Sequence, residues 1–115
     1  MWRQEITVEQ YQGLDSYEET SGTGLILYAM GVGVRTGVLD QKKYLPVFRR
    51  GIEGLKKVSI GENFETCHSC PACRCPEDGS IHAYLSQAPS YVDEPHGAGP
   101  VIMALAEAHR CGLTD

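Results

Sequence analysis

Four cysteines and a histidine lie close together in the string CHSCPACRCP, which begins at position 67. Thiolates two residues apart are suited to tetrahedral zinc, although structural zinc modules generally bring a second ligand pair from a distant position. Only His82, His96 or Cys111 could reach this string from elsewhere. We therefore expect no metal site. The pattern by itself leaves three readings open: a zinc site, a reactive or disulfide-forming pair, and ordinary thiols that line a loop or pocket. The zinc ligands under the first reading are Cys67, His68, Cys70, Cys73 and Cys75.

The histidine of the string DEPHGAGP is a second candidate for chemistry. The glycines around His96 would let the backbone approach a ligand, and a helix start nearby would favour an anionic group. The alternative is a loop histidine that is hydrogen-bonded to Asp93 or Glu94. The sequence leaves both readings open.

The segment from Asp15 to Asp40 predicts a helix that is apolar on nearly all sides and rich in glycine. Each glycine weakens a helix by roughly 1 kcal/mol relative to alanine, so close approach of another backbone or of a ligand is expected. Ser16 and Glu19 have the spacing of a capping box, and Gly37 suits a left-handed cap at the end. This helix must be enclosed by a second layer of helices.

A second helix is expected after Asp40, with Pro46 in its first turn and apolar residues at spacings of three and four. The region from Ser59 to Glu94 reads as a long cysteine-rich loop in which Ser80–Leu85 and Ser90–Val92 are short strand or turn pieces. A third helix is predicted with Gly99 as its cap and Pro100 as its first residue. The expected fold is therefore mainly α, with inner and outer helices.

Composition limits the classes of protein that the chain can be. Its 115 residues suit one domain, and a 42% hydrophobic share with 22% charged residues indicates a folded, cytoplasmic protein. The net charge of −5 is spread along the chain, and the Lys and Arg pairs are expected on a solvated helix face, so nucleic acid is not an expected partner. An odd number of cysteines without a signal peptide favours thiols. Without a run of about 18 apolar residues, no membrane association is expected.

Several strings, in order along the chain, resemble the C-terminal part of the unsaturated uronyl hydrolases of glycoside hydrolase families 88 and 105. The strings are WRQEI, SYEETSGTGLILYAMGVGVRTGVLD, YLPVFRRGIEGL and DEPHGAGPVIMALAEAHR. In that family a W-x-Q-V segment precedes an S-Y-x-E-T-S-G-T helix, and D-x-x-G-x-G-P or a close variant introduces the last helix. The positions that fall on the pattern are Trp2, Gln4, Glu19, Ser21, Gly22, Asp93, Gly97, Gly99 and Pro100.

The resemblance implies that residues 1–115 are a single C-terminal fragment of a six-hairpin glycosidase, forming the closing helical hairpins of a partial (α/α) toroid. It also implies a reaction in which an aspartic acid protonates C4 of a C4=C5 enol ether and water adds at C5. The family's catalytic aspartate, histidine and arginine-tryptophan motif have no counterpart in this chain. We therefore expect no catalytic residue here, and no hydrolysis of unsaturated uronides by the chain alone.

The resemblance also implies where an oligosaccharide substrate would bind. The candidate substrate-binding residues are Trp2, Glu19, Ser21 and His96, although Trp2 could equally be a core residue, and Glu19 and Ser21 could cap the helix instead. No cofactor is expected. The expected partners are an oligosaccharide once the missing hairpins are present, and either a second copy or a complementing chain. The alternative reading is a small noncatalytic module that binds a metal or a partner through the CHSCPACRC loop.

Overall fold

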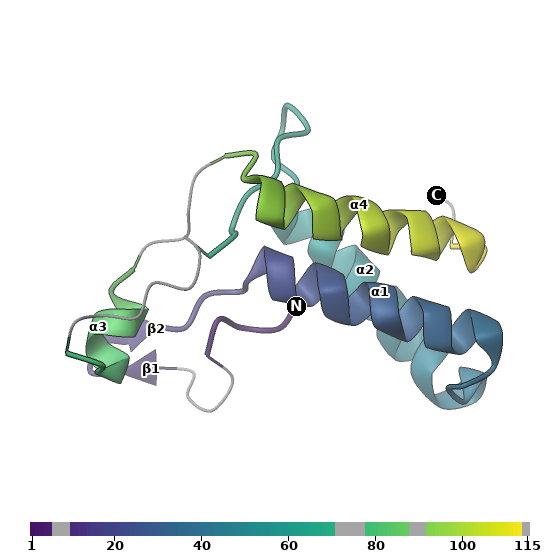
Figure 1. Ribbon diagram of the computed structural model, residues 1–115, viewed down its shortest axis with the longest axis horizontal. Helices are drawn as coiled ribbons and strands as arrows, with labels where there is room; N and C mark the ends of the chain where they lie inside the picture. The colour runs from purple at the N-terminus through teal and green to yellow at the C-terminus, as the bar shows by residue number, and fades with distance from the viewer. Residues whose placement is uncertain (6–9, 71–77, 88–91, 114–115) are drawn as a thin grey trace.

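The computed structural model describes residues 1–5, 10–70, 78–87 and 92–113, and it is mainly helical (Figure 1). No helix in these ranges is long and apolar enough to cross a membrane. The elements, in chain order, are β1 (Gln10–Tyr11), β2 (Leu14–Asp15), α1 (Thr20–Thr36), α2 (Gln41–Ser59), α3 (Ile81–Leu85) and α4 (Pro95–Arg110). This confirms the mainly α fold predicted from the sequence, and the arrangement is consistent with part of an α/α toroid.

Helices α1 and α4 run side by side in the same direction, and α2 runs antiparallel across one side of the pair (Figure 1). The α1 glycines contact α4 at two levels: Gly24 lies against Pro100, and Gly31 lies against Glu107. The core between the three helices consists of Leu27, Phe48, Ile52, Leu55, Val101, Ala104 and Ala108. The second layer of helices expected around α1 is therefore present on this side.

The end of α1 was predicted correctly, but its start was not. Gly37 ends the helix in the left-handed conformation, with φ at 77°, and Asp40 caps α2 by accepting a hydrogen bond from the Lys43 amide at 3.0 Å. The predicted capping box is wrong, because Glu19 is itself the N-cap. Ser16 instead exchanges two 2.8 Å hydrogen bonds with the backbone of Glu5.

Pro46, predicted in the first turn of a helix, and Pro100, predicted as a first helical residue, both lie further inside their helices. Helix α4 begins at Pro95, so the prediction that Gly99 caps it and Pro100 starts it is wrong. A proline at the first helical position needs no amide hydrogen, and Pro95 meets that condition. Pro100 is tolerated one turn later, where its buried ring packs against Gly24. Pro46 is likewise inside α2, on its exposed side.

The short elements between the helices differ from the strand or turn pieces that were expected. Ile81–Leu85 forms helix α3 instead of a strand or turn piece, because the Ser80 hydroxyl caps it by accepting from the Ala83 amide at 3.1 Å. Most of Ser90–Val92 lies outside the described residues. Strands β1 and β2 form an antiparallel hairpin whose turn residues, Gln12 and Gly13, have φ values of 51° and 81°.

A buried carboxylate joins the C-terminal halves of α1 and α4. Glu107 is fully buried, and its two oxygens accept hydrogen bonds from Arg35 Nε at 2.5 Å and Arg110 Nη1 at 3.3 Å. Burial alone would raise the pKa of Glu107, but the hydrogen bonds and charges of Arg35 and Arg110 hold this pKa below its ordinary value. The Glu107 carboxylate therefore stays charged and paired in the folded chain.

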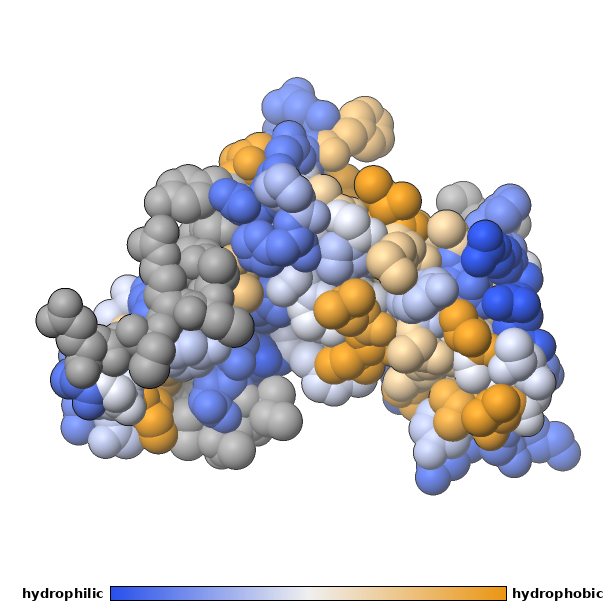
Figure 2. Space-filling model, viewed as in Figure 1, coloured by the Kyte–Doolittle hydropathy of each residue, from blue (hydrophilic) through white to orange (hydrophobic). Residues whose placement is uncertain are grey.

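The side of α1 and α4 that faces away from α2 is apolar and uncovered in the described chain (Figure 2). Leu25 is 51% exposed and Ile26 39% on α1, while Ile102 is 67% exposed and Met103 38% on α4. These four residues are named the apolar face below. An exposed apolar surface on two adjacent helices is typical of an interaction surface.

The contact between Gly24 and Pro100 gives a first prediction. A Cβ at Gly24 would lie 2.7 Å from Pro100, whereas a Cβ at Gly99 would meet nothing within 4 Å. Gly24→Ala should lower the free energy of unfolding by roughly 1–3 kcal/mol, because α1 and α4 must separate to admit the methyl group. Gly99→Ala should leave the free energy of unfolding unchanged or raise it by up to about 1 kcal/mol.

Urea denaturation followed by circular dichroism measures both variants. Equal stability of Gly24→Ala and Gly99→Ala would contradict the close packing of α1 against α4.

Candidate functional site at the helix starts

The N-terminal ends of the parallel helices α1 and α4 meet two other segments of the chain. The Glu19 amide donates to the Trp2 carbonyl at 2.9 Å, and the Thr20 amide donates to the His68 carbonyl at 3.0 Å. On the α4 side, His96 Nε2 lies 2.6 Å from the Cys70 carbonyl. This arrangement, named the group at the helix starts below, brings together Glu19, Ser21 and His96, three of the four residues predicted to bind substrate.

The Glu19 carboxylate is saturated by hydrogen bonds. Its Oε1 accepts from the Ser21 amide at 2.8 Å, the Ser21 hydroxyl at 2.7 Å and the Cys70 amide at 3.1 Å. Its Oε2 accepts from the Gly22 amide at 2.6 Å. Glu19 is only 7% exposed. This carboxylate therefore caps α1 and fixes the loop at Cys70, and its oxygens are engaged within the protein.

Gly22 and Gly97 provide the space that this arrangement requires. A Cβ at Gly22 would approach Glu19 Oε2 to 3.0 Å, and a Cβ at Gly97 would collide with the Ser69 side chain. Both glycines were singled out in the sequence by the resemblance. Their role in the structure is to let the loop residues pack against the helix starts.

A buried hydroxyl network beneath the group was not found from the sequence. Thr20 Oγ1 lies 2.8 Å from Ser59 Oγ and 2.6 Å from the Cys67 carbonyl, so it joins α1, the end of α2 and the loop. Asp93 ties the same loop to α4, since its Oδ1 accepts from the Thr66 amide at 2.8 Å. The sequence does not indicate this role of Thr20, because its hydrogen-bond partners are 39 and 47 residues away in the chain.

His96 is the most accessible of the candidate residues. Its side chain is 37% exposed, and its Nδ1 lies 3.4 Å from the Glu94 carboxylate. With Nε2 donating to the Cys70 carbonyl, the imidazole is held between the loop and the first turn of α4. The contact with Glu94 is one of the two possibilities left open by the sequence, and it leaves the exposed part of the ring available to a ligand.

Tyr17 adds a phenol to this region. Its hydroxyl is buried and has no hydrogen-bond partner among the described residues. Burial, followed by the charges of Cys70, Glu19 and Tyr84, raises the pKa of Tyr17. The phenol is therefore protonated at neutral pH and can act only as a neutral group.

Trp2 contacts the start of α1 through its backbone, and its side chain packs elsewhere. Its backbone holds the start of α1, because the Trp2 carbonyl accepts from the Glu19 amide at 2.9 Å and the Trp2 amide donates to Thr23 Oγ1 at 3.0 Å. Its side chain packs against the core and borders a hollow next to Val47 and Arg50 on α2. Trp2 thus lies beside α2.

The cysteine string is only partly described. Cys67 and Cys111 are free thiols, whereas Cys73 and Cys75 lie outside the described residues. In the described part of the chain, no group of three or more Cys, His, Asp or Glu side chains could hold a metal ion. Cys70 contributes its backbone amide and carbonyl to the group at the helix starts.

A mainly helical chain whose two parallel helices start at one polar group is consistent with one part of an α/α catalytic domain. The sequence matches the family described as Glycosyl Hydrolase Family 88 over residues 1–112, and the chain belongs to this family. Glycoside hydrolase function in general follows from this membership. Searches of curated proteins and of solved structures returned no match.

The saturation of Glu19 gives a second prediction. Glu19→Ala should lower the free energy of unfolding by roughly 1–3 kcal/mol, because it removes the carboxylate acceptor from the partly buried amides of Ser21, Gly22 and Cys70. Asp40→Ala removes the exposed cap of α2 and one hydrogen bond, and it should lower the free energy of unfolding by less.

Thermal or urea denaturation of the two variants provides the comparison. A smaller loss for Glu19→Ala than for Asp40→Ala would show that the Glu19 carboxylate is not the main support of the helix start.

Proposed function

We propose that this chain is part of a glycoside hydrolase that acts on unsaturated uronic-acid oligosaccharides by hydration of the C4=C5 enol ether. The observation that carries the proposal is the match to Glycosyl Hydrolase Family 88 along residues 1–112. The parallel direction of α1 and α4 supports it, since the inner helices of an α/α toroid share one direction. The proposal retains the cytoplasmic location expected from the composition.

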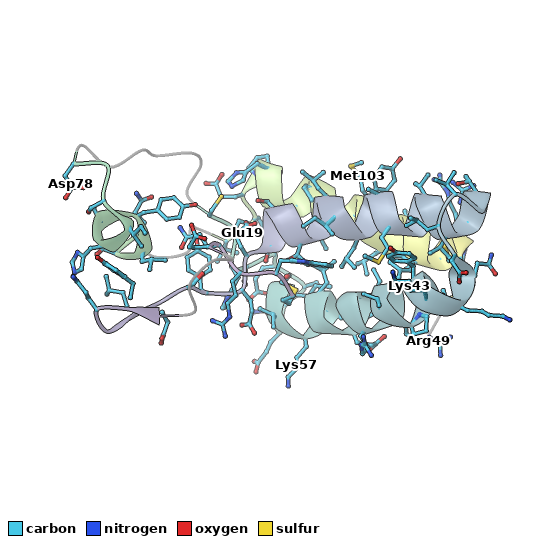
Figure 3. The ribbon with its side chains drawn as sticks, turned by 90° about the horizontal axis from the view of Figure 1, so that it is seen from below. Glu19, Lys43, Arg49, Lys57, Asp78 and Met103 are labelled. Carbon is cyan, nitrogen blue, oxygen red and sulfur yellow. The ribbon has the colours of Figure 1, made fainter. Side chains whose placement is uncertain are left out.

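In this proposal the chain supplies the closing hairpins of a six-hairpin toroid, with α1 and α4 as inner helices and α2 as an outer one. The apolar face supports this assignment, because Leu25, Ile26, Ile102 and Met103 are partly exposed on the side opposite to α2. Labelled Met103 points away from α2 in Figure 3. Further helices, from a second copy or from a complementing polypeptide, would bury this face.

The substrate would bind where the inner helices start. His96 is the residue proposed to face it, because part of its ring is exposed while Nε2 is fixed by the Cys70 carbonyl. Glu19 and Ser21 would act as positioning residues that hold the start of α1 and the loop. The acid that protonates C4 would come from residues outside this sequence, so the chain alone is proposed to be inactive.

An activity assay tests the reaction. The isolated chain, incubated with an unsaturated uronyl disaccharide, should not reduce the ultraviolet absorbance of the C4=C5 double bond. Mixing it with a polypeptide that carries the remaining hairpins of a full-length family member should produce a loss of absorbance. Turnover by the isolated chain would contradict the proposed inactivity, and an assembled but inactive mixture would contradict the proposed reaction.

The apolar face makes a separate prediction about association. Size exclusion with light scattering should give a mass above the 12.6 kDa of one chain. Ile102→Glu should shift the protein toward the monomer, because a charge on the apolar face cannot be buried unpaired. Val38→Glu is the matched control, since Val38 is 81% exposed and lies outside the apolar face. A wild-type monomer, or equal effects of both variants, would count against burial of this face.

A further inference from the structure

Six basic residues of α2 form three adjacent pairs that recur every seven residues. Seven residues are close to two helical turns, so the pairs share one side of α2 and follow each other at about 10 Å along its axis. Helix α2 carries these six charges and one acid, a net charge of +5 in a chain whose net charge is −5. The basic stripe, as it is named below, consists of Lys42, Lys43, Arg49, Arg50, Lys56 and Lys57.

The basic stripe lies opposite to the buried side of α2. Phe48, Ile52 and Leu55 are at most 1% exposed and form the side that contacts α1 and α4. Arg49 and Lys57 lie along the edge of α2 that faces away from α1 (Figure 3). Arg49 and Lys57 are thus on the other side of the molecule from the apolar face, and burial of the apolar face would leave them accessible.

Most of these charges are not neutralised within the described chain. Lys56 pairs with Glu53 at 3.6 Å, and Lys43 lies 5.1 Å from the centre of the Tyr44 ring. Among the described residues, no carboxylate lies within ion-pair distance of Arg49 or Arg50. Surface helices usually alternate charges of both signs, so a row of one sign favours an extended anion.

Two shallow hollows flank the middle of the basic stripe. One is lined by Leu45, Pro46, Arg49 and Arg50. The other, which shares Arg50, is lined by Met1, Trp2, Val47, Arg50 and Gly51. Apolar side chains beside guanidinium groups provide surfaces for the apolar face of a sugar ring and for its carboxylate at the same place.

We propose that the basic stripe binds a linear oligosaccharide that carries a carboxylate on every second sugar. The carboxylates of such a chain repeat on a length comparable to the spacing of the basic pairs, so each pair can meet one carboxylate while the hollows accept sugar rings. The choice of a carbohydrate rests on the proposed function. The stripe is distinct from the group at the helix starts, and it would hold the polymer during or between cleavage events.

The surface of α2 is poorly suited to an acidic helix. A helical partner needs an apolar seam between its charged positions, but Glu53, an exposed acid, lies between the second and third basic pairs on this side of α2. A disordered acidic peptide would lose more conformational entropy on binding than a stiff sugar chain. An uronate chain therefore matches the spacing and the chemistry of the stripe better.

Calorimetric titration of the protein with a hyaluronan octasaccharide that has no unsaturated end tests the proposal independently of any turnover. Arg49→Gln combined with Arg50→Gln should weaken binding roughly three- to tenfold, because two exposed ion pairs are lost. The matched control, Val38→Glu with Phe64→Glu, changes the net charge by the same amount at residues that are 81% and 87% exposed. It should change the affinity less than twofold.

Two further ligands complete the experiment. Neutral maltooctaose should not bind, and a polyglutamate of equal charge should bind more weakly than hyaluronan. The proposal is overturned if wild-type protein does not bind hyaluronan, if both double variants lose affinity equally, or if polyglutamate binds as tightly. Each of these results leaves the proposed hydrolase reaction untouched, since that reaction is measured by loss of the double bond.

Discussion

The close contact between α1 and α4 determines where the remaining parts of the chain lie. Gly24 lets the backbone of α1 approach Pro100, and Gly31 leaves room for the side chains of Glu107 and Phe48. At this short distance the Glu107 carboxylate has no access to water, so it depends on Arg35 and Arg110 for its hydrogen bonds. Parallel helices held in this way place both of their N-terminal ends at one end of the molecule.

The group at the helix starts follows from that arrangement. With the starts of α1 and α4 adjacent, one loop can bond to both: the Cys70 amide donates to Glu19, and the Cys70 carbonyl meets His96. Most of the polar atoms in the group are engaged in holding the backbone, which makes the region a rigid support. The exposed part of the His96 imidazole is the feature that remains available to a ligand.

The two sides of the three-helix unit differ in chemistry. Side chains of α1 and α4 form an apolar surface, whereas the outer side of α2 is basic (Figures 2 and 3). A helix pair that is apolar on both sides suits an inner position in a larger helical assembly, and a charged helix suits its outside. This polarity is the physical basis for treating α1 and α4 as inner helices and α2 as an outer one.

The sequence alone determined the mainly helical fold, the left-handed cap at Gly37, the N-cap at Asp40 and the buried side of α2, because these depend on residues within one or two turns. It also determined the family, through short strings distributed along nearly the whole chain. Tertiary structure decided that Glu19 and not Ser16 caps α1, since Ser16 bonds to Glu5 in a separate segment. It likewise decided the start of α4 at Pro95 and the position of Trp2 beside α2. Those outcomes depend on partners far away in the chain, and local propensity contains no information about such partners.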